Sequence, residues 1–371
     1  MRRLINVLKG IFIVLAVIMV SLCNSTQNCN AQQMDDVEIW SIDNQNSERT
    51  MQQIGELLHN EIQSQKEVQV GEHFFVYNVQ SNDGYFVYPI YVDYEYRYVA
   101  QVSPAGDVTI TDNLDIADKV QSLSSGKYIL YVDNGVLYAE NQADHILLIQ
   151  YMKQENVENS EFAIKTFEEK EAYLKTLYSL DTVKYVDITA VQFIELNNLA
   201  GKSRSVITGA DGNCITHKCN ITNFVNQGKN NLCWSAAAAT ITNYKTGSNI
   251  GAKYFADKYH IDYSTGATAN QTRTCLVGMG LSYNIESNKI SWSQIKNNIN
   301  ADKPFVVFLR NSKWGHAITG YGYGCLARDT ASGVRTIYAW DSNGYKISFL
   351  DNASTAITTS GSIWQWSETV Y

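Results

Sequence analysis

The sequence predicts an α+β fold built from two parts, and three observations lead to this prediction. The chain has 371 residues, which is long enough for two domains of ordinary size. Aromatic and β-branched runs separated by turn sequences dominate residues 73–151 and predict strands. Beyond residue 215, helical patterns come first and strand patterns follow, which predicts helices segregated from an antiparallel sheet.

The first 31 residues have the pattern of an export signal. Three basic residues precede an apolar run over residues 11–22, which is too short for a membrane span of about 20 residues. Small residues around Ala31 suit cleavage after that position. Acylation at Cys23, as in a lipoprotein, ranks second because Leu22 stands where a small residue is preferred, and an uncleaved anchor ranks third. The protein is therefore expected to be secreted or held at the cell surface, with no stable membrane span after signal removal.

Charge divides the remaining chain into two halves. Residues 32–205 carry 12 basic and 28 acidic side chains, whereas residues 206–371 carry 14 basic and 9 acidic side chains. The whole chain has a formal charge of −8, which argues against a nucleic-acid binder. Opposite charges on the two halves predict that they attract each other.

In the N-terminal half, residues 51–66 are predicted to form a helix and residues 160–179 a second one. Hairpin turns are expected at residues 82–84 and 133–135, where Asp-Gly and Asn-Gly supply positive φ. A closing strand or two is predicted over residues 183–196. The predicted strands between them are 74–77, 85–88, 91–102 and 108–110.

Residues 197–213 are small, polar and basic, which predicts an exposed linker. We place the domain boundary near residue 205. Lys202 and Arg204 offer a site for proteolytic cleavage within this segment.

The C-terminal half begins with helices. A helix is predicted from Cys233 to about residue 245, started by Asn230 or Asn231 and ended by Gly247. Another helix is expected near residues 251–259, and a capping box at Ser291 predicts a third that ends near residue 301. The predicted strands that follow are 304–310, 316–323, 334–341, 345–350 and 363–366.

Cys233 and His316 are candidates for nucleophilic catalysis. Cys233 falls in the first turn of an Ala-rich helix, where unpaired N–H groups favour a thiolate. His316 lies in a Gly-rich apolar strand, and Gly315 leaves room beside it. An imidazole beside a thiol gives the activated nucleophile of cysteine hydrolases. The alternatives are a buried structural cysteine and a histidine that belongs to the core.

Two further polar residues suit the same chemistry. Asp341 ends the next predicted strand, where a carboxylate can accept the second imidazole N–H and fix the ring. Asn343 is the rival for this orienting role, and the sequence Asp-Ser-Asn-Gly is also a good turn in its own right. Gln227 lies six residues before Cys233, so its amide can fold back to stabilise an oxyanion.

Taken in order, Gln227, Cys233-Trp234-Ser235, Gly315-His316-Ala317 and Asp341-Ser342-Asn343-Gly344 resemble the motifs of papain-like cysteine peptidases. The resemblance covers residues 215–371. Asp341 falls where plant papains have an asparagine. The histidine follows the cysteine by only 83 residues, a compactness that resembles staphopain-type and C39-like bacterial members.

This resemblance implies a helical lobe that carries the cysteine and an antiparallel β lobe that carries His316 and Asp341. It implies peptide hydrolysis by a Cys-His-Asp triad, with Gln227 and the Cys233 N–H at the oxyanion. Neither a metal nor a cofactor is expected. The expected substrates are proteins or peptides, and the chain is expected to be a monomer.

The resemblance also implies that the β-rich residues 32–205 are a propeptide and that the protein is made as a zymogen inhibited by it. The alternative is a permanent N-terminal binding domain. Two other functions stay open: a cysteine amidase that acts on cell-wall peptide or conjugated amides, and an inactive exported binding protein.

Five cysteines remain once the signal is removed, and setting Cys233 apart as the free thiol leaves an even number. A bond between Cys214 and Cys219 would close a small loop, and one between Cys275 and Cys325 would join the helical and strand parts. The alternative is four buried thiols.

Overall fold

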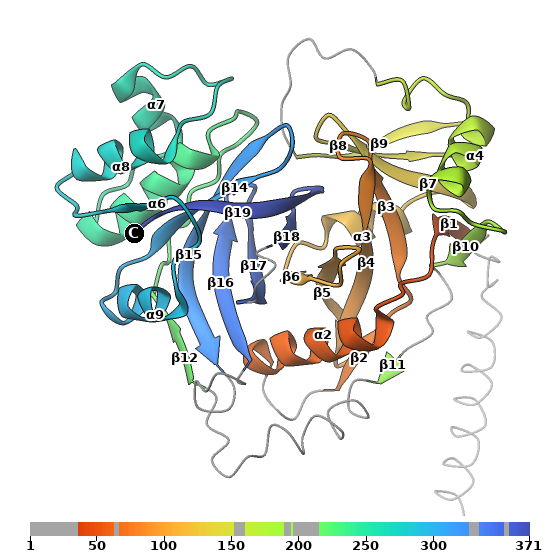
Figure 1. Ribbon diagram of the computed structural model, residues 1–371, viewed down its shortest axis with the longest axis horizontal. Coiled ribbons are helices and arrows are strands. Elements are labelled where there is room, and N and C mark those ends of the chain that lie inside the picture. The colour runs from red at the N-terminus through yellow and green to blue at the C-terminus, as the bar shows by residue number, and fades with distance from the viewer. Residues whose placement is uncertain are drawn as a thin grey trace, which may run out of the picture.

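The computed structural model describes residues 36–62, 67–151, 160–188, 194–195, 215–325, 334–351 and 356–371. The predicted export signal, the predicted linker with Lys202 and Arg204, and Cys214 lie outside these ranges. Within them the chain is α+β, as the sequence predicted, with helices and a large mixed sheet. Figure 1 shows helices α6, α7 and α8 at one end of the molecule and helix α4 at the other.

The N-terminal half consists mainly of strands. Strands β3 to β6 form an antiparallel run, β7 pairs in parallel with β3 and β1, and β8 and β9 continue antiparallel from β7. The helices are α2 (Ser47–Glu61), α3 (Asp115–Gln121) and α4 (Phe167–Leu177). The strands are β1 (Val37–Ser41), β2 (Val68–Val70), β3 (Phe74–Asn78), β4 (Asp83–Val92), β5 (Glu95–Val102), β6 (Val108–Thr111), β7 (Gly126–Asp133), β8 (Val136–Glu140), β9 (His145–Gln150), β10 (Lys184–Asp187) and β11 (Ile194–Glu195).

The turns of this half follow the sequence in one place and depart from it in another. Asn134 and Gly135 have φ of 50° and 75° and join β7 to β8, as their type predicted. Residues 91–102 were expected to form one strand, but Asp93 and Tyr94 take φ of 52° and 65° and separate β4 from β5. Tyr94 carries no turn signal, so this hairpin depends on the pairing of its two strands.

The helix predicted over residues 160–179 is shorter in the structure. It begins at Phe167 because Thr166 accepts a hydrogen bond from the Glu169 N–H while the Glu169 side chain accepts one from the Thr166 N–H. This reciprocal pair satisfies two of the N–H groups that a helix start leaves open. Helix α3 was not predicted, since seven residues give too short a pattern to recognise.

The C-terminal half places helices on both faces of an antiparallel sheet, with the strand order β18-β19-β14-β15-β16-β17. The helices are α6 (Cys233–Thr246), α7 (Lys253–Tyr259), α8 (Ala269–Val277) and α9 (Trp292–Asn300). The strands are β12 (Ile215–Lys218), β13 (Ile285–Glu286), β14 (Phe305–Arg310), β15 (Gly315–Cys325), β16 (Arg335–Asp341), β17 (Tyr345–Leu350), β18 (Ala356–Thr359) and β19 (Ser362–Val370).

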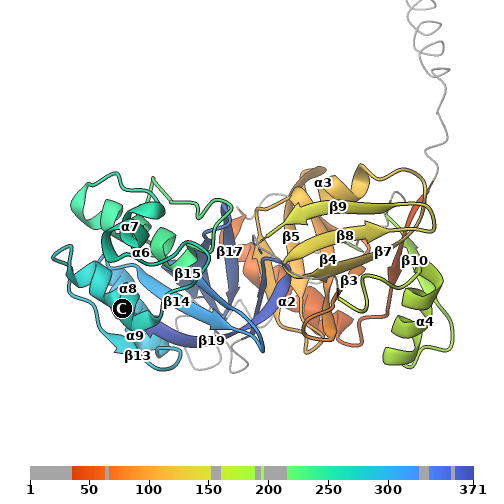
Figure 2. The same cartoon turned by 90° about the horizontal axis from the view of Figure 1, so that it is seen from above.

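Two apolar clusters hold this half together. Trp234 of α6 is buried with Phe308 and Ala317 of the sheet, and α7 and α8 pack into the same cluster. Trp292 of α9 belongs to a second cluster that contains Ile337 of β16. Figure 2 shows α6 and α9 at different levels of the same lobe. Because α6 packs closely on the sheet, its first residue is carried to the beginning of β15.

The sequence predicted the C-terminal end of α6 correctly but not the residue that caps its start. Gly247 ends the helix with φ of 72°, as predicted. Neither predicted asparagine caps its start, because Asn231 Nδ2 donates instead to the Ser264 carbonyl at 2.8 Å. Leu232 occupies the N-cap position, and no side chain there binds the first N–H groups. These groups therefore stay available beside Cys233.

The two halves share one sheet. Strand β6 pairs with β17 so that Thr111, Ile110 and Thr109 lie opposite Ile347, Ser348 and Phe349. In Figure 1 these strands lie side by side at the centre of the molecule. The salt bridges described, such as Lys184 with Asp43 or Lys289 with Asp351, join partners within one half. Backbone pairing therefore joins the halves, whereas attraction between their opposite net charges stays a prediction.

Candidate active site

Cys233 is the first residue of α6 and lies half-buried at the helix N-terminus. Its neighbours in the helix hold it in place, since Trp234 is fully buried and the Ser235 hydroxyl donates to the Ala252 carbonyl. The helix dipole and the open N–H groups around residue 233 favour a negative charge there. The sulfur is thus presented on a rigid support with partial access to solvent.

His316 is the second residue of β15 and has 3% of its surface exposed. Its Nε2 lies 3.0 Å from Oδ1 of Asp341, which ends the neighbouring strand β16. The Cys233 thiol lies near the imidazole and contributes to raising its pKa. Because Nε2 is engaged by the carboxylate, the thiol is left with Nδ1. The structure therefore brings together the cysteine, histidine and aspartate that the sequence singled out.

Burial and charge act in opposite directions on the histidine. Desolvation opposes the charged imidazolium, but the Asp341 carboxylate and the hydrogen bonds to Asp341 and Cys233 together raise the pKa of His316 to about 10. Burial also disfavours the Asp341 carboxylate, yet pairing with His316 holds the pKa of Asp341 below its ordinary value. The arrangement favours a charged imidazolium between the carboxylate and the thiol at neutral pH.

Four hydrogen-bond donors hold the Asp341 carboxylate at the end of β16. His316 and the Asn343 N–H, at 2.9 Å, bind Oδ1, while the hydroxyls of Thr359 and Ser360 bind Oδ2 at 2.7 and 2.8 Å. The Asn343 side chain points elsewhere, because its Nδ2 donates to Ser360 at 2.7 Å. The geometry gives the contact with the imidazole to Asp341 and not to Asn343. Thr359 and Ser360 were not among the predicted site residues, because their only signal was small polar residues before the last strand.

Gln227 is buried and fixed from two sides. Its N–H donates to the Ser342 carbonyl at 2.8 Å, and its Oε1 accepts from the Ser342 hydroxyl at 2.8 Å. With Oε1 engaged, the amide turns its Nε2 away from Ser342. Gln227 is therefore tied to the segment that follows Asp341, and its amide donor is available for another acceptor.

Trp364 of β19 is a residue near the site that the sequence analysis placed in a strand without a role. Its ring lies 5.6 Å from the His316 ring between centroids, at an angle of 35°. Its Nε1 donates to the Thr359 carbonyl at 2.8 Å. Trp364 thus lies beside the imidazole and is itself bonded to the strand that supplies Thr359.

The predicted disulfides are wrong. Neither predicted bond is present, because Cys219, Cys275 and Cys325 take part in no disulfide within the described residues. Cys275 packs among the side chains of α6 and α7, whereas Cys325 lies in the cluster on the side of α9. Burial raises the pKa of Cys219 to about 12 and that of Cys275 to about 11. These two thiols are accordingly kept protonated, in contrast to a nucleophile.

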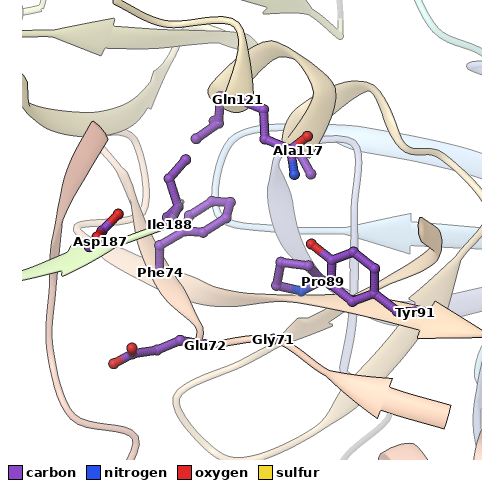
Figure 3. Close-up of a pocket in the computed structure, with 10 residues that line it drawn as sticks. Gly71, Glu72, Phe74, Pro89, Tyr91, Ala117, Gln121, Asp187 and Ile188 are labelled. Carbon is purple, nitrogen blue, oxygen red and sulfur yellow. The ribbon is translucent and has the colours of Figure 1, made fainter. Parts of the chain in front are cut away.

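The hollows that we find lie away from Cys233. A pocket of about 20 Å³ is enclosed in the N-terminal half by Phe74, Pro89, Tyr91 and their neighbours (Figure 3). A groove of about 810 Å³ runs between the halves, lined by β5 and β6 on one side and by residues near Cys219 and β17 on the other. Within the described ranges, no helix is long and apolar enough to cross a membrane.

Comparison with known families agrees with the residues of this site. The model of the Peptidase_C39 like family matches residues 221–365. The matched range contains Gln227, Cys233, His316 and Asp341. It supports the cysteine peptidase type to which the sequence motifs pointed, at the level of the family. No curated protein matches the chain significantly.

Proposed function

We propose that this protein is a secreted cysteine endopeptidase that hydrolyses peptide bonds with Cys233 as nucleophile. The observation that carries the proposal is the chain of contacts from Asp341 through His316 to Cys233, with 3.0 Å between Oδ1 and Nε2. A nucleophile, a base and a group that orients the base are the three components of this chemistry. The family match over residues 221–365 supports the same reaction class.

The proposed reaction begins with the Cys233 thiolate, which attacks the carbonyl carbon of the scissile bond. The His316 imidazolium donates its Nδ1 proton to the leaving amine, and the acyl group stays on the sulfur. His316 then accepts a proton from water, and the hydroxide that forms releases the acid and regenerates the thiolate. Asp341 keeps the ring oriented and stabilises its charge throughout, without taking the proton.

The tetrahedral intermediate in this scheme has a negatively charged oxygen. The Cys233 N–H at the uncapped start of α6 and the Gln227 Nε2 are the two donors available for it. The Ser342 hydroxyl holds the Gln227 amide by its Oε1, which leaves Nε2 as the donor end. The segment after Asp341 therefore supports both the base and the oxyanion donor.

The experiment that tests the proposal is hydrolysis of casein and of a fluorogenic peptide by the full chain, compared with Cys233→Ala and with Cys275→Ala as the matched control. Loss of activity in the first variant only is the expected result. Cleavage of purified peptidoglycan without cleavage of casein would favour the amidase alternative. An iodoacetamide reaction at Cys233 no faster than that of a model thiol would favour an inactive binding protein.

The zymogen role of residues 32–205 is a separate proposal about the same protein. Its support is the net charge of −16 on this half against +5 on the other, which favours association. Mass analysis during incubation, with Lys202→Gln and Arg204→Gln together as the uncleavable control, relates any cut to activity. A rise in activity on cutting is the result that inhibition requires. Unchanged or reduced activity after the cut would mean that this half is a permanent part of the enzyme.

A further inference from the structure

The turn between β18 and β19, formed by Thr359, Ser360 and Gly361, connects the N-terminal half to the candidate active site. The hydroxyls of Thr359 and Ser360 both donate to Oδ2 of Asp341. Hydrogen bonds to a carboxylate are among the stronger ones in proteins. Because they occupy Oδ2, they fix the plane of the carboxylate and leave Oδ1 directed at His316.

The turn itself has a conformation that requires support. Ser360 has φ of 50° and Gly361 has φ of 73°, both in the left-handed region. For a residue with a side chain this region is unfavourable. The Ser360 N–H donates to the Tyr345 hydroxyl at 3.0 Å, which is one contact that holds the turn from within its own half.

Two residues of the N-terminal half hold the same turn from the other side. Asn78, at the end of β3, donates from Nδ2 to the Gly361 carbonyl at 2.9 Å and to the Ser362 hydroxyl at 3.0 Å. The Tyr151 ring packs so closely on Gly361 that a Cβ there would lie 2.5 Å from a ring atom. Both residues are buried, with Asn78 exposed by only 3%.

Asn78 is itself held rigidly, which makes it an effective support. Its Oδ1 accepts from the N–H groups of Gln80 and Ser81 at 3.1 and 3.2 Å. All of its polar atoms are therefore used, two bonds within the N-terminal half and two across to the turn. Thr109 adds a further bond across the halves by accepting from the Thr358 N–H at 3.1 Å.

We infer that the N-terminal half is a positioning element of the active site, in which Asn78 and Tyr151 hold the turn that orients Asp341. The inference rests on the proposed function, because orientation of the imidazole matters for catalysis. Release of the N-terminal half would then remove the support of Asp341 and lower activity, whereas release of an inhibitory half would raise activity. Asn78 and Tyr151 act through Thr359 and Ser360, so we describe them as positioning residues.

The first test compares Asn78→Ala with Asn44→Ala in the full chain. Asn44 is a matched control, since it is a buried asparagine of the same half whose Nδ2 donates to Thr50 and Tyr88 and whose Oδ1 accepts from the Asn46 N–H. Asn78→Ala removes four side-chain hydrogen bonds and Asn44→Ala removes three, but only Asn78→Ala removes bonds to the turn. Thermal unfolding checks that the two variants lose similar stability.

Two readouts separate positioning from stability. For peptide hydrolysis, Asn78→Ala should lower kcat about tenfold with little change in KM, because misplacement of a catalytic group affects the chemical step. For alkylation of Cys233 by iodoacetate, the fall in rate at alkaline pH should begin about one pH unit lower than in the unsubstituted protein, because a loosened Asp341 retains the His316 proton less well. Asn44→Ala should change neither readout.

A second pair keeps the inference testable if Asn78→Ala does not fold. Gly361→Ala would push a methyl group into the Tyr151 ring, whereas Gly280→Ala at a similar φ of 80° meets no atom within 4 Å. Both substitutions carry the strain of a positive φ, so a difference between them reports the contact with Tyr151. Only Gly361→Ala is expected to lower kcat and shift the alkylation profile.

The inference would be overturned if kcat and the alkylation profile changed equally in Asn78→Ala and Asn44→Ala, and equally in Gly361→Ala and Gly280→Ala. The alkylation profile does not depend on any substrate, so it tests the inference even if the protein cleaves no peptide. Absence of hydrolysis by the unsubstituted chain would contradict the proposed function, whereas an unshifted alkylation profile in Asn78→Ala and Gly361→Ala would contradict the positioning role.

Discussion

Both halves of the molecule contain a buried ion pair, Lys170 with Glu140 in one and His316 with Asp341 in the other, and the two pairs differ in what surrounds them. In the N-terminal half, Lys170 of α4 and Glu140 of β8 lie 2.7 Å apart, with 1% and 10% of their side chains exposed. In the C-terminal half, His316 and Asp341 lie 3.0 Å apart, with 2% and 0% exposed. Burial of charge is costly in both cases and is tolerated only where hydrogen bonds compensate for it.

The lysine pair is closed, by which we mean that its hydrogen-bonding groups all have partners inside the protein. Lys170 Nζ donates to Glu140 and also to the carbonyls of Ala163 and Lys165 at 3.0 and 2.6 Å, which uses all three of its donors. Tyr131 donates to the other carboxylate oxygen of Glu140 at 2.9 Å. Every strong hydrogen-bonding group of this pair is thus satisfied within the protein, which suits a structural role.

The histidine pair is closed at the Asp341 carboxylate but open at the second nitrogen of His316. Asp341 is surrounded by donors, but the second nitrogen of His316 faces the half-buried thiol of Cys233. A proton on that nitrogen has a partner that can react and that solvent can reach. The comparison indicates that the structural pair and the candidate catalytic pair differ in the partner of the last proton, and not in the depth of burial.

The largest expected effect comes from removal of the Cys233 thiol, which faces the second nitrogen of His316. Cys233→Ala should reduce peptide hydrolysis by about 10⁴-fold or more, because nucleophile and base act as one unit. His316→Ala should abolish hydrolysis to the same extent. Steady-state assays with active-site titration measure both. Turnover above a few per cent in well-folded Cys233→Ala protein would show that another residue is the nucleophile.

Breaking the closed pair should affect stability and leave the chemistry alone. Lys170→Met leaves Glu140 buried without its partner and should lower the free energy of unfolding by about 3–5 kcal/mol. Urea titration measures this loss, with the exposed Lys119→Met as a control that should change it by less than about 0.5 kcal/mol. A large fall in kcat of the folded variant would contradict the assignment of a purely structural role.

Asp341 and Asn343 can be distinguished by their substitution with alanine. Asp341→Ala removes the acceptor of the imidazole and should reduce kcat by about 10²-fold or more. Asn343→Ala keeps its backbone N–H bond to Asp341 and loses only the bond to Ser360, so a reduction under about tenfold is expected. The reverse order of the two kcat values would transfer the orienting role to Asn343.

The smallest expected effect is a shift in pH dependence. Although burial opposes it, pairing with Asp341 raises the pKa of His316 from its ordinary 6.5 to about 10. Asp341→Asn should therefore move the alkaline limit of kcat/KM down by at least about one pH unit. The stability that this pair contributes is complete below pH 6.5 and is lost as the pH rises through about 10. A pH profile identical to that of the unsubstituted protein would disprove the coupling.

Most of the site residues were predictable because their motifs are local. Cys233 at a helix start, His316 beside Gly315 and Asp341 at a strand end are each visible in a few residues. Strands β14 to β17 and β19 were also predictable, since each is an apolar run bounded by turns, whereas the short strands β12, β13 and β18 were not predicted. Thr359, Ser360 and Trp364 were not, because nothing in a small polar turn or an isolated tryptophan indicates which carboxylate or ring it will meet.

The disulfide prediction failed for a related reason. Pairing Cys275 with Cys325 assumed that the helical and strand parts bring these side chains together, but the two thiols lie in different apolar clusters. An even number of cysteines limits the possible bonds and says nothing about distances. Only the packing of α8 against the sheet decides where Cys275 lies.

By itself, the sequence determined the α+β class, the longer C-terminal strands and the candidate site residues, because periodicity, caps and turns are properties of short segments. The tertiary structure alone decided that β6 continues the sheet of the other half through β17, and that Asn78 and Tyr151 reach the turn beside Asp341. Those contacts join residues more than 200 positions apart. Their formation depends on how whole sheets pack, which no local pattern specifies.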